Sequence, residues 1–286
     1  MRFATILTAD GPRAAMQVGR AFMDLNQTDP ALPADMCEFL ALGSDGVKRA
    51  EDAMGRRTAA FCDAGDVELA PPVTDPKKII GIGLNYAAHA AEGGRKPPKE
   101  PVVFAKFNTS LRATGDIVPL PAVSEQVDYE AELVIVIGKG GRNIKKEEAY
   151  SRIAGFTCGN DVSARDWQHK ESDQWVLGKS FDGFAPLGPA IVTVDELPNP
   201  HNLRIQLRLN GKTMQDANTS DMIFKCDELV AYVSQVFTLQ PGDLIYTGTP
   251  SGVGAGRKPP VWMKDGDVTE VEIEKIGVLK NTFRSK

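Results

Sequence analysis

The chain contains few cysteines and no long hydrophobic run. Its four cysteines, Cys37, Cys62, Cys158 and Cys226, are scattered through 286 residues, and no two of them form a C-x-x-C pair. This spacing gives no sign of a disulfide framework and predicts free thiols in a reducing compartment. No apolar segment reaches the ~20 residues of a membrane span. Polar residues interrupt the N-terminal segment too early for a signal peptide, so we expect a cytoplasmic protein.

An excess of positive charge is also absent. The net charge is −5 and the isoelectric point is about 5.4, so the chain carries no basic footprint for nucleic acid. The same balance gives no attraction toward an anionic membrane surface. The G-x-G-x-x-G, G-x-S-x-G and phosphate-loop patterns do not occur, which argues against dinucleotide binding and against a serine-hydrolase nucleophile. Neither nucleic acid nor a membrane is therefore an expected partner.

The organisation of the chain indicates two parts of unequal size. Residues 1–70 form a lead segment in which a strand over 3–8 precedes partly helical sequence around 14–25 and 36–42. This pattern predicts a small N-terminal α/β domain. The proline-rich stretch 70–76 cannot continue a helix or an inner strand. We therefore place the boundary after residue 70 and a second, larger domain over 71–286.

The second part is rich in strand patterns and has few helical ones. Leu203 to Leu209 alternates apolar with polar residues and then meets Asn210-Gly211, the strongest short signal for a β-hairpin. The predicted class is mainly β with a few helices. Further strands are expected at 78–83, 102–107 and 267–276, and helices at 145–153 and 227–237.

The segment Asp128 to Glu132 leads directly into the apolar residues Leu133 to Ile137. Alternation followed by β-branched residues predicts a strand that enters a core, with Glu130 and Glu132 on one face. Their α-carbons would lie roughly 6.5 to 7 Å apart, so both carboxylates can reach one divalent cation. An isolated pair of this kind is more typical of a solvated strand face. Without a cation or a proton, two acids beside a buried strand are costly.

A third acid, Asp161, ends an apolar segment and precedes a polar turn, where its side chain can point into a cleft. Two glutamates and one aspartate supply only oxygen ligands, which suits Mg²⁺ or Mn²⁺ and disfavours zinc. Taken alone, an Asn-Asp pair at a turn is more commonly a capping element. The metal interpretation therefore depends on the three acids meeting in space.

His89 and Glu92 lie three residues apart in a short segment that would be a helix ended by Gly93-Gly94. A carboxylate beside an imidazole orients the ring and raises its basicity, as a general base near neutral pH requires. The same spacing also occurs in ordinary helix-surface pairs. The following segment 95–99 contains only arginine, lysine and proline. It would form a mobile lid with the base on its inner side.

Two further features have both ordinary and functional interpretations. Lys179 follows Gly178 in an apolar setting, where it is either a surface residue with a buried stem or a cation for a substrate carboxylate or enolate. The glycine-rich loop 246–256 follows a predicted strand. It would let backbone N–H groups and Thr249 approach a small anionic ligand.

Five motifs follow one another along the chain: Gly83-Leu84-Asn85-Tyr86 with His89 and Glu92, Asp128-Tyr129-Glu130-Ala131-Glu132-Leu133, Asn160-Asp161 with Arg165, Asp166 and Gln168, Gly178-Lys179-Ser180-Phe181, and Thr247-Gly248-Thr249-Pro250-Ser251-Gly252-Val253-Gly254. In this order they resemble the fumarylacetoacetate hydrolase superfamily over roughly residues 76–283, whereas residues 1–70 lie outside the resemblance. The resemblance implies a mixed β-roll or β-sandwich catalytic domain and a homodimer.

The resemblance also implies a role for individual residues. It implies a bound Mg²⁺ or Mn²⁺, a catalytic dyad on a closing lid, and a pocket for a small 2-oxo acid. A basic residue often occurs on the strand over 102–107 in this family, which adds one expected substrate contact. The expected residues are Glu130, Glu132 and Asp161 for the metal, His89, Glu92 and Lys179 for catalysis, and Lys106, Gln168 and Thr249 for substrate binding.

Such a site would stabilise the enolate of a 2-oxo acid. If His89 activates water, the reaction is hydrolysis of the C–C bond of an acylpyruvate-type 2,4-dioxo acid, including 2,4-dioxo-3-deoxy sugar acids, and this is our leading prediction. Oxaloacetate decarboxylation forms the same enolate, and proton movement alone would give a tautomerase or an isomerase of a 2-hydroxy-dienoic diacid. A non-catalytic 2-oxo acid binding protein is the remaining alternative. The fold cannot choose among these reactions.

Overall fold

A computed structural model describes residues 1–56, 59–170 and 174–285, and strands predominate over helices in these residues. The strands are β1 (Arg2–Thr8), β2 (Gly11–Val18), β3 (Ala21–Asp24), β4 (Phe61–Asp63), β5 (Leu69–Ala70), β6 (Ile79–Gly83), β7 (Val102–Lys106), β8 (Leu111–Arg112), β9 (Ile117–Leu120), β10 (Val127–Asp128), β11 (Ala131–Ile137), β12 (Ile153–Asn160), β13 (Ser163–Ala164), β14 (Ala185–Thr193), β15 (Arg204–Leu209), β16 (Lys212–Asn218), β17 (Leu244–Tyr246), β18 (Val268–Ile273) and β19 (Gly277–Ser285). The α-helices are α1 (Leu25–Thr28), α2 (Met36–Ala41), α3 (Gly43–Met54), α4 (Ala87–Glu92), α5 (Arg165–Gln168), α6 (Val176–Lys179) and α7 (Cys226–Ser234), and the 3₁₀-helices are η1 (Asn108–Ser110), η2 (Lys146–Arg152), η3 (Thr219–Asp221) and η4 (Gly254–Gly256).

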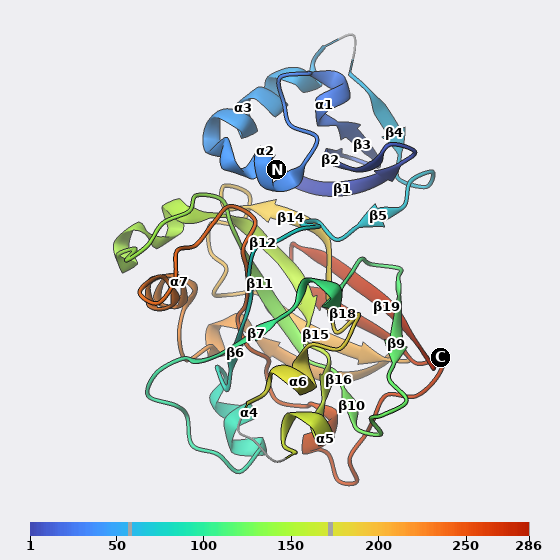
Figure 1. Cartoon of the computed structure of the whole chain (residues 1–286), viewed down its shortest axis with the longest axis vertical. Helices are drawn as coiled ribbons and strands as arrows, with labels where there is room; N and C mark the ends of the chain where they lie inside the picture. The colour runs from blue at the N-terminus through green and yellow to red at the C-terminus, as the bar shows by residue number, and fades with distance from the viewer. Residues whose placement is uncertain (57–58, 171–173, 286) are drawn as a thin grey trace.

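Two β-sheets packed against each other form the centre of the protein (Figure 1). Among the described residues, the larger sheet has 12 strands in the order β4-β3-β2-β1-β14-β12-β11-β17-β6-β7, while β5 pairs with β1 and β8 pairs with β14. The smaller sheet has five strands in the order β16-β15-β18-β19-β9. One hydrophobic core lies between the two sheets, as in a β-sandwich.

The central strand β11 carries the predicted site, and every residue in it is buried. It pairs antiparallel with β12 on one side and with β17 on the other. Leu133, Ile135 and Ile137 pack into the core between the sheets, whereas Val134 and Val136 pack into a second core on the opposite face. Burial on both faces explains the uninterrupted apolar run, because a strand with one solvated face would alternate.

Residues 1–70 extend the larger sheet and share a hydrophobic core with the rest of the protein. β1 pairs with β2 on one side and with β14 on the other. Phe3 and Phe39 belong to the same buried cluster as Val134 and Val136 of β11. In Figure 1 this segment is the blue lobe at the top. The domain boundary expected after residue 70 stays a prediction.

The predicted fold class, mainly β with a few helices, is confirmed. The hairpin predicted at Asn210-Gly211 joins β15 to β16, and the φ angles of 52° and 77° at these residues are those of a type I′ turn. The helical prediction around 14–25 is wrong, because this segment forms β2 and β3. A short apolar cluster fits both the helical and the strand periodicity, and here pairing with β1 makes the segment a strand. At 145–153 the chain forms the 3₁₀-helix η2.

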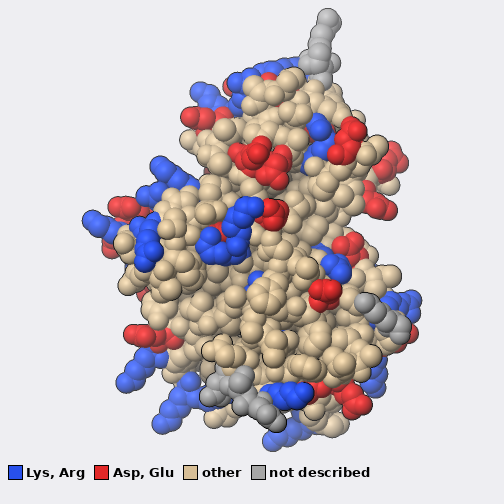
Figure 2. Space-filling view, in the orientation of Figure 1, with Lys and Arg blue, Asp and Glu red and all other residues tan. Residues whose placement is uncertain are grey.

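Charged side chains of both signs occur together on one face of the protein. On the face shown in Figure 2, lysine and arginine are interspersed with aspartate and glutamate. No helix within the described ranges has both the length and the hydropathy needed to cross a lipid bilayer.

A buried carboxylate joins two helices of the N-terminal lobe. Asp29 follows α1, and its oxygens accept hydrogen bonds of 2.7 and 3.0 Å from the guanidinium of Arg49 in α3. Arg56 lies 3.0 Å from the same carboxylate. The hydrogen bonds from Arg49 lower the pKa of Asp29 to about 2. Because this pKa is depressed in the folded state, the pairing stabilises the fold above the unfolded value of about 4.

We expect Asp29→Asn to lower the urea midpoint of unfolding at pH 7, and expect the difference from the wild type to shrink as the pH falls from about 4 to 2. In that range the wild-type carboxylate is protonated and loses the same interaction. Urea unfolding at several pH values measures the effect. Glu51→Gln, an exposed position on α3, is the control. A pH-independent difference would contradict this explanation.

Candidate active site

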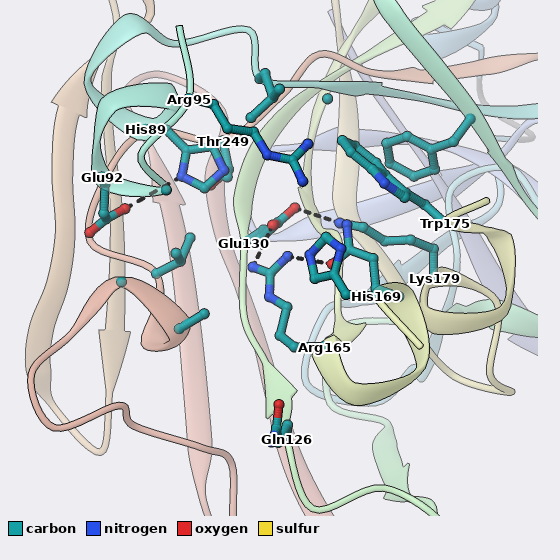
Figure 3. Close-up of a pocket in the computed structure, with 18 of the residues that line it drawn as sticks. His89, Glu92, Arg95, Gln126, Glu130, Arg165, His169, Trp175, Lys179 and Thr249 are labelled. Atoms are coloured by element: carbon teal, nitrogen blue, oxygen red, sulfur yellow. Dashed lines mark hydrogen bonds and ion pairs between the residues drawn. The ribbon is translucent and has the colours of Figure 1, made fainter. Parts of the chain in front are cut away.

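A cavity of about 500 Å³ lies where the ends of several strands of the larger sheet meet three short helices. Residues from β6, β7 and β11 line it, together with residues from α4, α5 and α6 and from the glycine-rich loop. Figure 3 shows the side chains of this cavity pointing toward one another from these separate elements. Most of the residues predicted for the site lie in or directly beside this cavity.

The three predicted metal ligands converge at the inner end of the cavity. Glu130 immediately precedes β11, Glu132 lies within it, and Asp161 follows the paired strand β12. Ala131 of β11 is the register partner of Asn160, so the ends of the two strands bring the acids together. One ligand oxygen from each acid lies within 4.8 Å of the others, and all three residues are buried.

Two lysines lie against these acids. The Lys179 ammonium group is 2.8 Å from Glu130 Oε2 and 2.7 Å from Asp161 Oδ2. The ammonium group of Lys106, at the end of β7, donates to Asp161 Oδ1 and to the carbonyl of Val162. Lys179 lines the cavity, whereas Lys106, like Asp161, is buried and is not part of the cavity wall. This placement favours Lys106 as a support for Asp161 over the substrate contact expected from the sequence.

Glu130 and Glu132 have pKa values shifted in opposite directions. Burial raises the pKa of Glu132 well above its ordinary value, and the negative charges of Asp161 and Glu130 raise it further. Burial also opposes ionisation of Glu130, but the positive charges of Lys179 and Arg165 hold its pKa well below its ordinary value. A hard divalent cation would stabilise the ionised form of Glu132 and accept oxygen from all three acids. The residues therefore fit Mg²⁺ or Mn²⁺.

Arg165 is a site residue to which the sequence analysis gave no role. Its Nε donates to Asp128 Oδ2 at 2.9 Å, and a terminal nitrogen donates to Glu130 Oε1 at 2.6 Å. The other terminal nitrogen donates to Gln168 Oε1 at 2.9 Å. The planar guanidinium thus fixes one predicted metal ligand and one predicted substrate residue together. Arg165 lies four residues after Asp161 in one of the five family motifs, and this position could have marked it as a site residue.

The glycine-rich loop after β17 holds carboxylates of the chain itself. The sequence predicts that its N–H groups approach a small anionic ligand. Instead, these groups point at site carboxylates, because the loop lies against β11 and α4. The hydrogen bonds run from Gly248 N to Glu132 at 2.7 Å, from Gly252 N to both oxygens of Glu92 at 3.0 and 3.1 Å, and from Gly254 N and Ala255 N to Asp128 at 2.7 and 3.0 Å.

The predicted dyad forms on α4. His89 Nδ1 is 3.4 Å from Glu92 Oε2, and the N–H of Gly252 fixes the carboxylate. An Nδ1–H bond to Glu92 leaves the lone pair of Nε2 available to the cavity. Figure 3 shows His89 across the cavity from Lys179, with Glu130 between them. A β-carbon on Gly256 would lie only 2.3 Å from Glu92 Cδ, so a side chain at this position would displace the Glu92 carboxylate.

A strained turn positions α4. Leu84, between β6 and α4, has a φ angle of 58°, which is uncommon for a residue with a side chain. The buried side chain of Asn85 holds the turn by accepting from Phe224 N at 2.7 Å and donating to the carbonyls of Thr247 and Phe224 at 2.7 and 3.0 Å. The turn therefore ties the dyad to the start of the glycine-rich loop.

The remaining predicted substrate residues are buried and line the cavity. Gln168 ends α5, and Thr249 lies in the glycine-rich loop. Thr249 Oγ1 accepts a hydrogen bond of 2.8 Å from Gln215, which leaves its hydroxyl hydrogen to donate into the cavity. Three further residues, Arg95, His169 and Trp175, line the outer part of the cavity, and the sequence analysis assigned none of them a role there.

The match to a protein family covers most of the chain. Residues 78–284 match the family model described as fumarylacetoacetate (FAA) hydrolase C-terminal. The chain belongs to the fumarylacetoacetate hydrolase family. The resemblance found in the sequence motifs is therefore confirmed, and the family match covers the smaller sheet, the larger sheet from β6 onward, the acids, the dyad and the glycine-rich loop.

Relatives in the family are named for different activities. The Xenopus laevis protein named oxaloacetate tautomerase fahd2, mitochondrial, is 45% identical over 286 residues, which cover 98% of this chain and 89% of that protein. The structure of 5-carboxymethyl-2-hydroxymuconate delta-isomerase from Mycobacterium smegmatis is 34% identical, with a TM-score of 0.81 and complete coverage of both chains. Maleylpyruvate hydrolase from Sphingobium sp. SYK-6, in complex with manganese (II) ion and pyruvate, is 30% identical, with a TM-score of 0.83 and coverage of 100% and 99%.

We expect Glu132→Gln to weaken Mn²⁺ binding at least about tenfold, because it removes a charged ligand and loss of even an outer partner commonly costs 10- to 100-fold. Asp166→Asn is the matched control, since Asp166 lines the same cavity outside the acid cluster. Calorimetric titration with Mn²⁺ measures both affinities, and circular dichroism checks that both variants fold. Equal Mn²⁺ affinity in wild type and Glu132→Gln would refute the assignment of this ligand.

Proposed function

We propose that this protein is an enolising enzyme that interconverts the keto and enol forms of oxaloacetate or a closely similar 2-oxo acid. The observation that carries the proposal is the His89–Glu92 dyad, held across the cavity from the buried acids and Lys179. This arrangement brings a proton acceptor to one side of a substrate whose oxygens are held on the other. The 45% identity to a protein named oxaloacetate tautomerase favours this reaction over the others that the family catalyses.

The substrate would be held by its carboxylate and 2-oxo oxygens at the inner end of the cavity. When bound by Glu130, Glu132 and Asp161, Mg²⁺ or Mn²⁺ supplies Lewis-acid stabilisation of the negative charge that develops on the 2-oxo oxygen. The ammonium group of Lys179 contacts two of these acids and lines the cavity, so it adds positive charge there. Gln168 and Thr249 are placed to donate hydrogen bonds to the carboxylate.

Proton transfer would then occur at C3 of the substrate. His89 Nε2 takes the proton as the C3–H bond breaks, and the electron pair forms the C2=C3 double bond while the C2 oxygen becomes negative. Returning the proton to that oxygen completes the enol and leaves His89 neutral, so no proton is gained or lost in the cycle. Glu92 stabilises the transient imidazolium and holds its orientation. No other reactant is required.

The leading prediction from the sequence, hydrolysis of an acylpyruvate-type 2,4-dioxo acid, is the second candidate. The size of the cavity favours it, because about 500 Å³ exceeds what a four-carbon acid fills. The relative named maleylpyruvate hydrolase, whose structure contains manganese (II) ion and pyruvate, also supports it. In this reaction His89 would activate water instead of removing a C3 proton. Oxaloacetate decarboxylation would release carbon dioxide, so it is distinguished by its product.

We also propose Mg²⁺ or Mn²⁺ as the cofactor, a homodimer as the assembly and the cytoplasm as the location, as the sequence suggested. The manganese in the related hydrolase structure supports the cofactor. The relatives named oxaloacetate tautomerase are described as mitochondrial, which makes the mitochondrion the main alternative location.

We expect His89→Ala to lower kcat for oxaloacetate tautomerisation by about 10²- to 10⁴-fold, the usual contribution of a general base. His201→Ala is the matched control, because His201 lies outside the cavity and contacts Tyr150. The decay of the enol absorbance with Mg²⁺ measures tautomerisation, and coupled assays measure pyruvate and carbon dioxide.

Three outcomes would overturn the tautomerase proposal. A wild-type protein that releases pyruvate from acylpyruvates without accelerating oxaloacetate tautomerisation is a hydrolase. Full tautomerase activity in His89→Ala would show that the His89–Glu92 dyad does not take part in the reaction. Tight binding of 2-oxo acids with no turnover would instead support the non-catalytic alternative.

We expect Gly256→Ala to lower kcat by about 10- to 100-fold with little change in Mn²⁺ affinity, because the added methyl group displaces Glu92 from Gly252 and His89. Gly55→Ala is the control, since a β-carbon there meets no atom within 4 Å. Parallel kinetics and Mn²⁺ titration separate the two effects. Equal loss of metal binding and turnover would show that the loop acts on the acid cluster instead.

A further inference from the structure

We propose that Arg95, supported by Trp175 and His169, forms a subsite for the distal carboxylate of a dicarboxylate substrate at the mouth of the cavity. The inference rests on the proposed function, because it assumes that the 2-oxo end of the substrate is held at the acid cluster. The second carboxylate of a four-carbon 2-oxo diacid would then point outward. The side chains at the outer end of the cavity determine whether this negative charge is stabilised.

Arg95 extends into the cavity from the segment that follows α4. Its backbone N–H donates to the carbonyl of Ala90 at 2.8 Å, which anchors the residue to the helix that carries the dyad. Figure 3 shows the guanidinium pointing into the cavity above Glu130, between His89 and Trp175. The guanidinium carbon lies 5.8 Å from the centre of the Trp175 ring, which is the distance of a cation–π contact.

Among the described residues, Arg95 has no carboxylate partner, which distinguishes it from the other cations of the site. Arg165 is bound to Asp128 and Glu130, and Lys179 is bound to Glu130 and Asp161. Those positive charges are already compensated by acids of the chain. Within the part of the chain that the structure describes, the guanidinium of Arg95 therefore has N–H donors left for an anion that enters the cavity, and its fork geometry matches a carboxylate.

Asp166, a cavity-lining acid, does not compete for Arg95. One of its oxygens accepts from Ser124 Oγ at 2.7 Å and the other from the N–H of Glu125 at 3.1 Å. These bonds direct the carboxylate toward the 124–125 turn. Glu92, also on the wall, accepts from Gly252 and contacts His89.

Trp175 gives Arg95 a fixed surface to pack against. Its ring centre lies 5.7 Å from that of Phe104 in β7 and 6.4 Å from that of His169. A β-carbon on Gly83 would come within 2.3 Å of the indole, so the absence of a side chain there lets the ring lie close to the end of β6. The indole is thus held from two sides, and the guanidinium loses less freedom when it binds an anion.

His169 adds a second polar group at the same place. Burial and the positive charges of Arg165, Arg95 and Lys179 lower the pKa of His169. The ring therefore lies within the field of these cations and is neutral near pH 7. A carboxylate bound beside Arg95 would offset that field and accept a hydrogen bond from the imidazole.

Direct binding of two unreactive 2-hydroxy acids tests the subsite. Malate and lactate differ by the carboxylate on C3, so the ratio of their affinities reports the distal contact alone. Calorimetric titrations in the presence of Mg²⁺ compare wild type, Arg95→Ala, Arg95→Lys and Lys96→Ala. Lys96 is the matched control, because it is the next cation of the same segment, is exposed and does not line the cavity.

We expect the wild type and Lys96→Ala to bind malate more tightly than lactate. Arg95→Ala should lower this preference by about 10- to 100-fold, as expected for the loss of a hydrogen-bonded charge. Arg95→Lys should retain part of the preference, because it keeps the charge but loses the fork. An undiminished malate preference in Arg95→Ala, or no malate preference in the wild type, would overturn the subsite.

The binding experiment and the kinetic experiment fail independently. Malate and lactate are not turned over, so a catalytic failure on oxaloacetate leaves the measured preference intact and refutes only the proposed function. Conversely, tautomerisation of oxaloacetate by a wild type without malate preference refutes the subsite alone. Trp175→Phe should keep more of the malate preference than Trp175→Leu, because only an aromatic ring provides the cation–π contact.

Discussion

Three carboxylates, on Glu130, Glu132 and Asp161, are buried within 4.8 Å of one another, and much of the surrounding structure compensates their repulsion. Carboxylates in a low-dielectric interior either take up protons or require opposite charge close by. Lys106, Lys179 and Arg165 supply that charge from three separate elements, and backbone N–H groups supply partial charge. The acid cluster is therefore stabilised by side chains and backbone groups from several separate parts of the chain.

The glycine-rich loop contributes to this compensation without any charge of its own. Its N–H groups donate hydrogen bonds to Glu132 of the acid cluster, to Glu92 of the dyad and to Asp128. Asp128 in turn binds the guanidinium of Arg165. A single loop thus sets the relative positions of both halves of the site. Side chains on this loop would fill the space that its backbone needs, as the close approach of Gly256 to Glu92 shows.

Much of the fold could be predicted from the sequence, because the signals there are local, whereas the acids of the inner site were brought together only by the resemblance of several motifs to a family. The β11 strand, the hairpin at Asn210-Gly211 and the dyad on α4 all follow from short patterns. The strands at 11–24 could not, since pairing with β1 decides their conformation. The outer wall also lay beyond prediction, because Arg95 and Trp175 meet across 80 positions of sequence, and no local pattern reports that contact.

The pairing of β1 with β14 has a consequence for biosynthesis. The N-terminal residue hydrogen-bonds to Thr193 across 192 positions of sequence, and β1 lies between β2 and β14 in the sheet. On the ribosome, β1 and β2 can pair as soon as they emerge, and β5 can then pair with Thr5 and Ile6 on the other edge of β1. Arg2 and Phe3 on that edge have no strand partner until β14 has been translated. An unpaired strand edge is a template for association with other chains. The start of β1 therefore stays open to such association until β14 completes the sheet.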